Sequence, residues 1–348
     1  MSSHKYTLDH VRPSRFLAGL KRLRSFQFTR LRTGLGRVFL HSACGFALMF
    51  SVCPDGKCET RMDKPQERIV RKALGAGRWF PGDKENLRRI IDKCIENAGV
   101  EKINGTIVGA VAPHAGYLYS GKVAGYTFRA LKENAAAGHK PETVVVLGLS
   151  HRGGFPGVAL MDGDAIETPL GEAILDREAG EALAAQSPWI FFDYSPHAGE
   201  HSAENEIPFV QVALPGAKIL VGLIGDHDPR ILNDLIAALG DLSKKKKIVV
   251  IASSDMLHDP DHALVAKIDR ETLKKIRAMD KMGIRKDWTP HNQILCGIAP
   301  VLAVMGFAEQ QGCKKGTILY YRNSGDDFPA SRGRWVVGYG SVIFAVPE

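Results

Sequence analysis

The apolar residues of this 348-residue chain fall into two kinds of segment from about residue 70 onward. Short runs rich in β-branched residues predict buried strands at 106–112, 143–148, 157–161, 219–224, 248–253, 317–321 and 335–346. Apolar residues spaced three and four apart predict helices at 86–97, 122–134, 175–186, 204–213, 229–242, 263–279 and 292–307. Because strands that are apolar throughout alternate with amphipathic helices, the sheet should be covered on both faces. We therefore predict a three-layer α/β/α fold with a central, mostly parallel or mixed sheet.

The composition fits a folded protein of ordinary type. With 45% hydrophobic and 24% charged residues the chain can bury a sizeable core, which excludes collagen-like and wholly disordered proteins. No segment between residues 70 and 348 has the composition of a linker, so we expect a single α/β domain over residues 61–348. Its cysteines, Cys94, Cys296 and Cys313, are scattered, which is typical of a reduced, cytoplasmic protein.

The first sixty residues differ from the rest in charge. They hold ten basic and three acidic residues, a net charge of +7, whereas the other 288 residues hold 36 and 35. The nearly neutral remainder gives no reason to expect a nucleic-acid partner. Residues 38–52 are apolar but shorter than the roughly 20 residues that span a bilayer, so we expect no membrane span. We expect residues 1–60 to be a disordered extension or sequence upstream of the true start, with an export or organelle signal as the alternative.

Three histidines each follow a predicted strand. His114 comes after 106–112, His151 after 143–148 and His258 after 248–253. Ligands of open α/β sheets bind beyond the carboxyl ends of the strands, and imidazole is the commonest protein ligand for Zn, Cu, Fe and Ni. One such histidine is more often a surface or hydrogen-bonded residue, but three in equivalent positions favour a shared metal site at one edge of the sheet.

Two further segments contain side chains that can bind metal. His201 and Glu204 are three residues apart and would share a face of a helix, although the same segment also fits a capped helix start. Cys296 lies near the start of an apolar helix. There it is either a small buried residue or a thiolate, which is a soft ligand for Cu, Zn or Fe.

These motifs, in this order, resemble those of the Memo family, which is also met as the B component of the AmmeMemoRadiSam group. The resemblance covers about residues 70–346, and residues 76–81 resemble the family's opening segment. The matching segments are Ala112-Pro113-His114-Ala115-Gly116-Tyr117, Tyr119-Ser120-Gly121, Ser150-His151, Glu200-His201-Ser202-Ala203-Glu204, Ser253-Ser254-Asp255 with His258, and Cys296-Gly297.

The resemblance implies a fold like that of class III extradiol dioxygenases, which hold iron(II) with two histidines and a carboxylate. In the Memo family the matching pocket has two histidines and a cysteine, which here are His114, His151 and Cys296. Asp255 and His258 fall on further pocket residues of the family. The residues expected around them are His201, Glu204 and Tyr117. A thiolate in place of a carboxylate makes the site softer, which favours Cu(I) or Zn over oxygen-activating Fe(II). The resemblance implies a transition metal ion as cofactor, Cu or Fe, with Zn as another choice.

Three functions are compatible with such a pocket. The first is a metal-dependent oxidoreductase acting on a small phenol or thiol, with His258 as acid or base, oriented by Asp255. The second is an adaptor that binds a metal or a peptide without turnover. The third is a hydrolase with a metal-bound water, for which Glu204 would be the base. The resemblance also suggests a radical-SAM protein of the same system as a partner.

Overall fold

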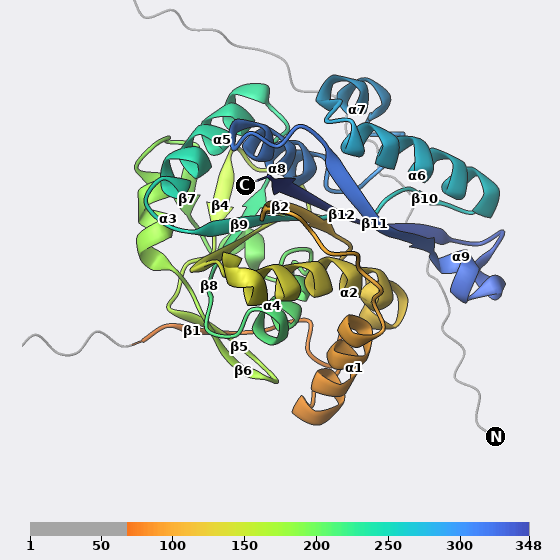
Figure 1. The fold of residues 1–348 in the computed structure, drawn as a ribbon, viewed down its shortest axis with the longest axis horizontal. Coiled ribbons are helices and arrows are strands. Elements are labelled where there is room, and N and C mark those ends of the chain that lie inside the picture. Colours follow the sequence, from red (N-terminus) through yellow and green to blue (C-terminus); the bar gives the residue numbers. More distant parts are fainter. Residues whose placement is uncertain (1–67, 348) are drawn as a thin grey trace, which may run out of the picture. The chain divides into compact units, whose positions relative to one another are not determined.

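The computed structural model describes residues 68–347, so the extension predicted over residues 1–60 lies outside the described residues. The main sheet of this part of the chain has nine strands in the order β10-β12-β2-β9-β3-β8-β4-β7, with β11 paired to β12 (Figure 1). Four neighbouring strands at its centre are parallel to one another. These are β2 (Thr106–Ala112), β9 (Ile248–Ser253), β3 (Thr143–Leu149) and β8 (Lys218–Ile224).

Antiparallel pairings extend the sheet on both sides of this centre. β12 (Val336–Val346) is antiparallel to β2, and it pairs in turn with β11 (Gly316–Asn323) and β10 (His258–Asp259). On the other side, β4 (Val158–Leu160) is antiparallel to β8 and parallel to β7 (Ile190–Phe192). The sheet is therefore mixed. A separate small sheet consists of β1 (Val70–Lys72), β5 (Ala165–Thr168) and β6 (Gly171–Ile174).

The central strands divide their side chains between two hydrophobic cores. In β3, Val144 and Val146 belong to one core, and Val145 and Leu147 belong to the other. β9 alternates in the same way, because successive side chains of a strand point to opposite faces. Both faces of the sheet are thus apolar, which explains why these strands read as unbroken hydrophobic runs in the sequence.

Helices cover both faces of the main sheet (Figure 1). One core is shared with α1 (Lys84–Glu96), α2 (Tyr117–Asn134) and α4 (Ile207–Ala213). The other is shared with α3 (Arg177–Ala184), α5 (Pro229–Ser243), α6 (His262–Arg277), α7 (Lys281–Asp287) and α8 (Ile298–Gln310). The short α9 (Ser324–Asp327) follows β11. The predicted three-layer α/β/α architecture is confirmed. No helix among residues 68–347 has both the length and the apolar character needed to span a membrane.

Three predicted helices start more than two residues from the expected position. The helix expected at 122–134 begins five residues earlier, at Tyr117, with Gly116 as its N-cap. The helix expected at 204–213 begins as a turn of 3-10 helix at Glu204–Glu206, and the α-helix starts only at Ile207, followed by Pro208. The helix expected at 292–307 begins at Ile298 with Gly297 as its N-cap. The residues before it are held instead by the main chain of Asp255, whose carbonyl accepts a hydrogen bond from the Cys296 N–H at 3.1 Å.

β4 was predicted at 157–161, but the other short strands and α7 escaped the sequence analysis, because two to four residues, or about two mostly polar helical turns, carry no readable periodicity. The order of the parallel strands matters more for the site. β9 lies between β2 and β3, so the carboxyl ends of all three meet at one edge of the sheet. The loops after these ends carry His114, Asp255 and His151.

Candidate metal centre

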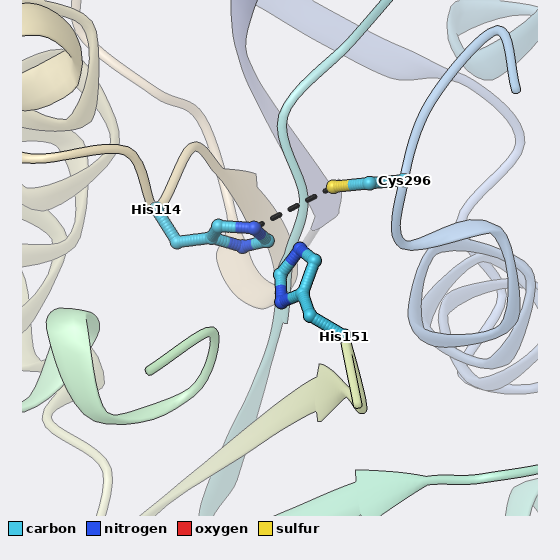
Figure 2. A group of neighbouring side chains, drawn as sticks. All are labelled: His114, His151 and Cys296. Atoms are coloured by element: carbon cyan, nitrogen blue, oxygen red, sulfur yellow. Dashed lines mark hydrogen bonds between the residues drawn. The ribbon is translucent and has the colours of Figure 1, made fainter. Parts of the chain in front are cut away.

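Three side chains from distant parts of the chain meet at this edge. His114 follows β2, His151 follows β3, and Cys296 lies in the loop before α8 (Figure 2). One donor atom from each lies within 4.8 Å of the other two, an arrangement that could hold a metal ion. His114 and Cys296 are buried, while 34% of the His151 side chain is exposed. The group is therefore closed on two sides and open to solvent at His151.

The spacing of the donors fits direct coordination. The Nε2 atom of His114 lies 3.5 Å from the Sγ atom of Cys296, along the dashed line in Figure 2. Metal–nitrogen bonds of about 2.0–2.1 Å and metal–sulfur bonds of about 2.3 Å, in tetrahedral geometry, place nitrogen and sulfur about 3.5 Å apart. Two imidazoles and a thiol are also a donor set that suits Cu, Zn or Fe. The residues present fit such an ion.

A hydroxyl behind His114 fixes which nitrogen of its ring is available. The Ser253 Oγ atom lies 2.5 Å from the Ser202 carbonyl oxygen, which can only accept, so the hydroxyl proton is donated there. The same Oγ lies 3.0 Å from His114 Nδ1 and must accept from it. His114 therefore carries its proton on Nδ1 and presents an unprotonated Nε2. Burial, followed by the nearby His151 and His201, holds the pKa of His114 well below its ordinary value.

The Ser253 hydroxyl has a third neighbour. An oxygen of the fully buried Glu206 carboxyl lies 2.9 Å from it. This oxygen is a second acceptor for the Ser253 hydroxyl, beside the Ser202 carbonyl. Burial raises the pKa of Glu206 well above its ordinary value, with a smaller contribution from Asp255. The result is a chain from Glu206 through Ser253 to the ring of His114.

A buried carboxylate holds His151 in the same manner. Glu200 Oε1 accepts from His151 Nδ1 at 2.9 Å, and Glu200 Oε2 accepts from the His151 N–H at 2.6 Å. The main-chain N–H groups of His201 and Ser202 also donate to Glu200 Oε1. These hydrogen bonds outweigh burial and lower the pKa of Glu200 well below its ordinary range. Glu200 is thus an anion that leaves Nε2 of His151 as the free donor, an arrangement typical of metal-bound histidines.

Cys296 is a thiol rather than a thiolate in this arrangement. Burial, together with the charge of Asp255, raises its pKa to about 12. Of the two alternatives for Cys296, the buried thiol describes the metal-free protein, because the side chain is buried and has no cation beside it to favour the anion. Its proton can be donated to Nε2 of His114, and a metal ion would take the place of that proton.

Asp255 positions the site through the main chain. Its Oδ1 accepts from the N–H groups of His114 and Ala115 at 2.9 and 3.2 Å, and its own N–H donates to the Cys296 sulfur at 3.2 Å. Burial raises the pKa of Asp255 to about 7. The expected pairing of Asp255 with His258 is absent from the hydrogen bonds of residues 68–347, because Asp255 binds the loop of His114 instead.

His258 and His201 lie beside the three donors. Nε2 of His258 is buried and has no hydrogen-bond partner among the described residues. Burial, and then His151, lowers the pKa of His258 and of His201 to about 4, so both rings are neutral. The His201 ring stacks on Trp79 at 4.0 Å and lies 4.8 Å from the His151 ring. Trp79, His151 and His201 also line one surface pocket.

A second group, His151 with Glu200 and His201, also has donor atoms within 4.8 Å of one another. Here the hydrogen bond between Glu200 and His151 already uses one donor atom of each residue. In the site with Cys296, His151 would use its Nε2 atom, which has no hydrogen bond among residues 68–347, because Glu200 binds Nδ1. We therefore place the candidate metal position among His114, His151 and Cys296.

Two residues expected around the pocket have other contacts. Glu204 accepts from the Gly75 N–H at 2.6 Å, and burial raises its pKa. The Tyr117 hydroxyl donates to the Asn205 carbonyl at 2.7 Å, while its ring packs against aromatic neighbours. Both residues hold loops next to the site.

Sequence reasoning missed four residues that support the donors: Glu200, Ser253, Glu206 and Trp79. Glu200 and Ser253 lie inside the motifs already quoted, one residue before His201 and at the end of the 248–253 strand. Their place inside these motifs indicated that they lie near the site. Their role, however, depends on which nitrogen of a histidine ring they contact, and the sequence does not give that. Glu206 carried no separate signal, since it reads as an ordinary helix-start acid.

Comparisons with known proteins agree with the motif analysis. The family described as Memo-like protein matches residues 71–343. A MEMO1 family protein of Methanopyrus kandleri is 34% identical over 286 residues, which cover 79% of this chain and 99% of that protein. One from Nitrosopumilus maritimus is 31% identical over 281 residues, which cover 79% of this chain and 100% of that protein. Among solved structures, an uncharacterized Escherichia coli K12 protein has a TM-score of 0.41 at 13% identity, over 68% of this chain and 99% of that chain.

Proposed function

The chain belongs to the Memo family, and from that premise we propose that it is a metal-dependent oxidoreductase acting on a small molecule at the His114, His151 and Cys296 site. One observation carries the proposal. Each imidazole has its Nδ1 atom held by a buried side chain, so both rings offer Nε2 to the same space as the Cys296 sulfur. A site arranged in this way is preorganised for one metal ion with room for a further ligand.

The donor set favours a soft metal ion. A thiol that loses its proton to a metal is a soft ligand, and soft ligands favour Cu(I) or Zn over the hard ions. A copper or iron ion held there would supply one-electron redox chemistry. The substrate class that fits is a small phenol or thiol, oxidised with dioxygen as the electron acceptor. The opening at His151 gives such a molecule access from solvent.

The neighbouring residues have distinct proposed roles. His258 is neutral and its Nε2 atom has no partner among residues 68–347, so it can accept the proton of a phenol or thiol. Asp255 is a positioning residue, because it holds the main chain of His114 and the sulfur of Cys296 in place. The stacked His201 and Trp79 shield one side of the site from water.

The two other functions find less support in the contacts. The hydrolase considered above uses Glu204 as its base, yet the Glu204 carboxyl accepts a hydrogen bond from the Gly75 N–H. A protein that only binds a metal would need the two anchored imidazoles and the thiol, but it would not need the neutral His258, whose Nε2 atom has no partner among residues 68–347. Family membership, rather than any contact of the described residues, supports a cytoplasmic radical-SAM protein as a partner.

Metal analysis followed by oxygen uptake tests the proposal. Protein purified without added metal is analysed for its elements, loaded with copper or iron, and assayed with catechols and thiols in an oxygen electrode. We expect one metal ion per chain and oxygen consumption in the native protein. Cys296→Ala should lose both, and His258→Ala should keep the metal but lose the oxygen uptake. His291→Ala, at an exposed histidine outside the site, is the matched control.

Two results would overturn the proposal. A metal-loaded native protein that consumes no oxygen with any substrate of the panel would support the adaptor function instead. If Cys296→Ala retained the metal content of the native protein, Cys296 would not be a ligand and the proposed donor set would be wrong.

A further inference from the structure

A groove lies between α1 and α2, beside the loop that carries Trp79. It has a volume of about 700 Å³. α1 contributes residues three and four apart, including Ile90, Lys93 and Cys94, and α2 contributes residues four apart, including Leu118 and Lys122. One continuous face of each helix therefore lines the groove.

The apolar lining of the groove is unusually accessible. Leu118 is 75% exposed and Trp79 is 39% exposed, and both are among the few large apolar side chains on the described surface. Phe80 and Tyr117, which are buried, form its floor. A pocket lined by aromatic and aliphatic side chains, with a few polar groups at its rim, is the usual setting for a small organic ligand.

The charges at the rim all have one sign. Arg78, Lys93 and Lys122 line the groove, and its lining includes no carboxylate. None of the three cations forms an ion pair with an acid within residues 68–347; Lys122 instead lies 5.8 Å from the centre of the Tyr320 ring. Three uncompensated cations around an apolar cleft favour a ligand with a negative charge.

The groove is preformed by close helix packing. A Cβ atom on Gly125 would lie 2.3 Å from the Cys94 carbonyl oxygen, so only glycine permits the approach of α2 to α1. The loop that bears Trp79 is fixed to the start of α2 by a hydrogen bond from the Tyr117 N–H to the Trp79 carbonyl at 2.8 Å. The groove therefore exists before a ligand binds, and binding does not require the two helices to move.

We propose that this groove binds a small amphipathic anion, with an aromatic or aliphatic body in the cleft and its acidic group at the rim cations. Arg78 and Trp79 also line the pocket that contains His151 and His201, so the ligand would lie against the wall of the metal centre. The binding goes beyond the proposed oxidoreductase function and does not require a metal.

A pair of fluorescent probes tests the proposal in the full-length protein. Anilinonaphthalene sulfonate combines an aromatic body with a sulfonate, and phenylnaphthylamine has a similar body without charge. We expect the anionic probe to bind the native protein in a saturable way and more tightly than the neutral one. Lys93→Gln with Lys122→Gln should weaken the anionic probe roughly threefold to thirtyfold, since each exposed charge contributes modestly, and should leave the neutral probe unchanged.

Controls separate the groove from other surfaces. Lys132→Gln with Lys267→Gln removes the same charge from exposed positions outside the groove and should change neither probe. Leu118→Glu places a negative charge in the groove at an exposed position and should abolish the anionic probe without lowering the melting temperature. His114→Ala should leave the binding of both probes intact, so that a failed metal site and a failed groove are distinguishable.

Three results would overturn the proposal. The native protein could fail to bind the anionic probe, or the neutral probe could bind as tightly as the anionic one. Equal losses in the groove variant and in the control variant would show that the probe responds to net charge alone.

Discussion

Replacing Ser253 by alanine tests whether the side chains behind the donors set the metal affinity. The change leaves Nδ1 of His114 without its acceptor, at a position that is fully buried. It also leaves the Ser202 carbonyl and one oxygen of Glu206 without their partner. Loss of such an outer contact typically lowers metal affinity about 10- to 100-fold, which is about 1.4–2.7 kcal/mol of binding free energy. The orphaned buried groups should also lower the free energy of unfolding by about 1–3 kcal/mol.

The assay is a competition titration with a metal-binding dye, using Zn²⁺ and Co²⁺, alongside thermal unfolding of the metal-free protein. Ser341→Ala is the matched control, because it removes a buried hydroxyl of β12 that hydrogen-bonds to Thr127 of α2. That variant should lose stability but keep its metal affinity. The Co²⁺ spectrum of Ser253→Ala should also change, since the orientation of the His114 ring is no longer fixed. If Ser253→Ala binds metal within twofold of the native protein, the tautomer argument is wrong.

Three further predictions concern single positions. Gly297→Ala should lower the metal affinity, as measured by competition titration. The added Cβ atom would lie 2.7 Å from the main-chain oxygen at the end of β9, so the loop that carries Cys296 must move. In metal-free protein, Cys296 should be alkylated more slowly than Cys94, which is only half-buried and whose pKa is raised to about 11, as peptide mapping over time would reveal. Burial raises the pKa of Asp269 to about 7 from an unfolded value near 3.8, so its contribution is fully present below pH 3.8 and is lost as the pH rises through about 7. The free energy of unfolding of the native protein should therefore fall by up to about 4 kcal/mol from this group as the pH rises from about 4 to about 8. Asp269→Asn should lack that part of the fall, and denaturant titrations across this pH range measure it.

Long apolar elements were predictable because their pattern depends on the sheet alone. β2, β3, β8 and β9 were found within one residue at each end, since both of their faces are buried. The start of α8 was not, because its position depends on the hydrogen bond between Cys296 and the main chain of Asp255, forty-one residues away. Such tertiary contacts override a continuous apolar pattern, and no window of sequence contains them.

The same distinction separates the donors from the residues that support them. His114 and His151 could be found because they follow parallel strands, and parallel strands end at a common edge. The roles of Glu200 and Asp255 could not be assigned, because an acid near a histidine can bind the ring, the main chain or a metal. Glu200 binds the ring of His151, whereas Asp255 binds the main chain of His114. With both carboxylates committed in this way, the Cys296 sulfur is left as the third donor, and that is why the site differs in chemistry from a two-histidine, one-carboxylate iron centre.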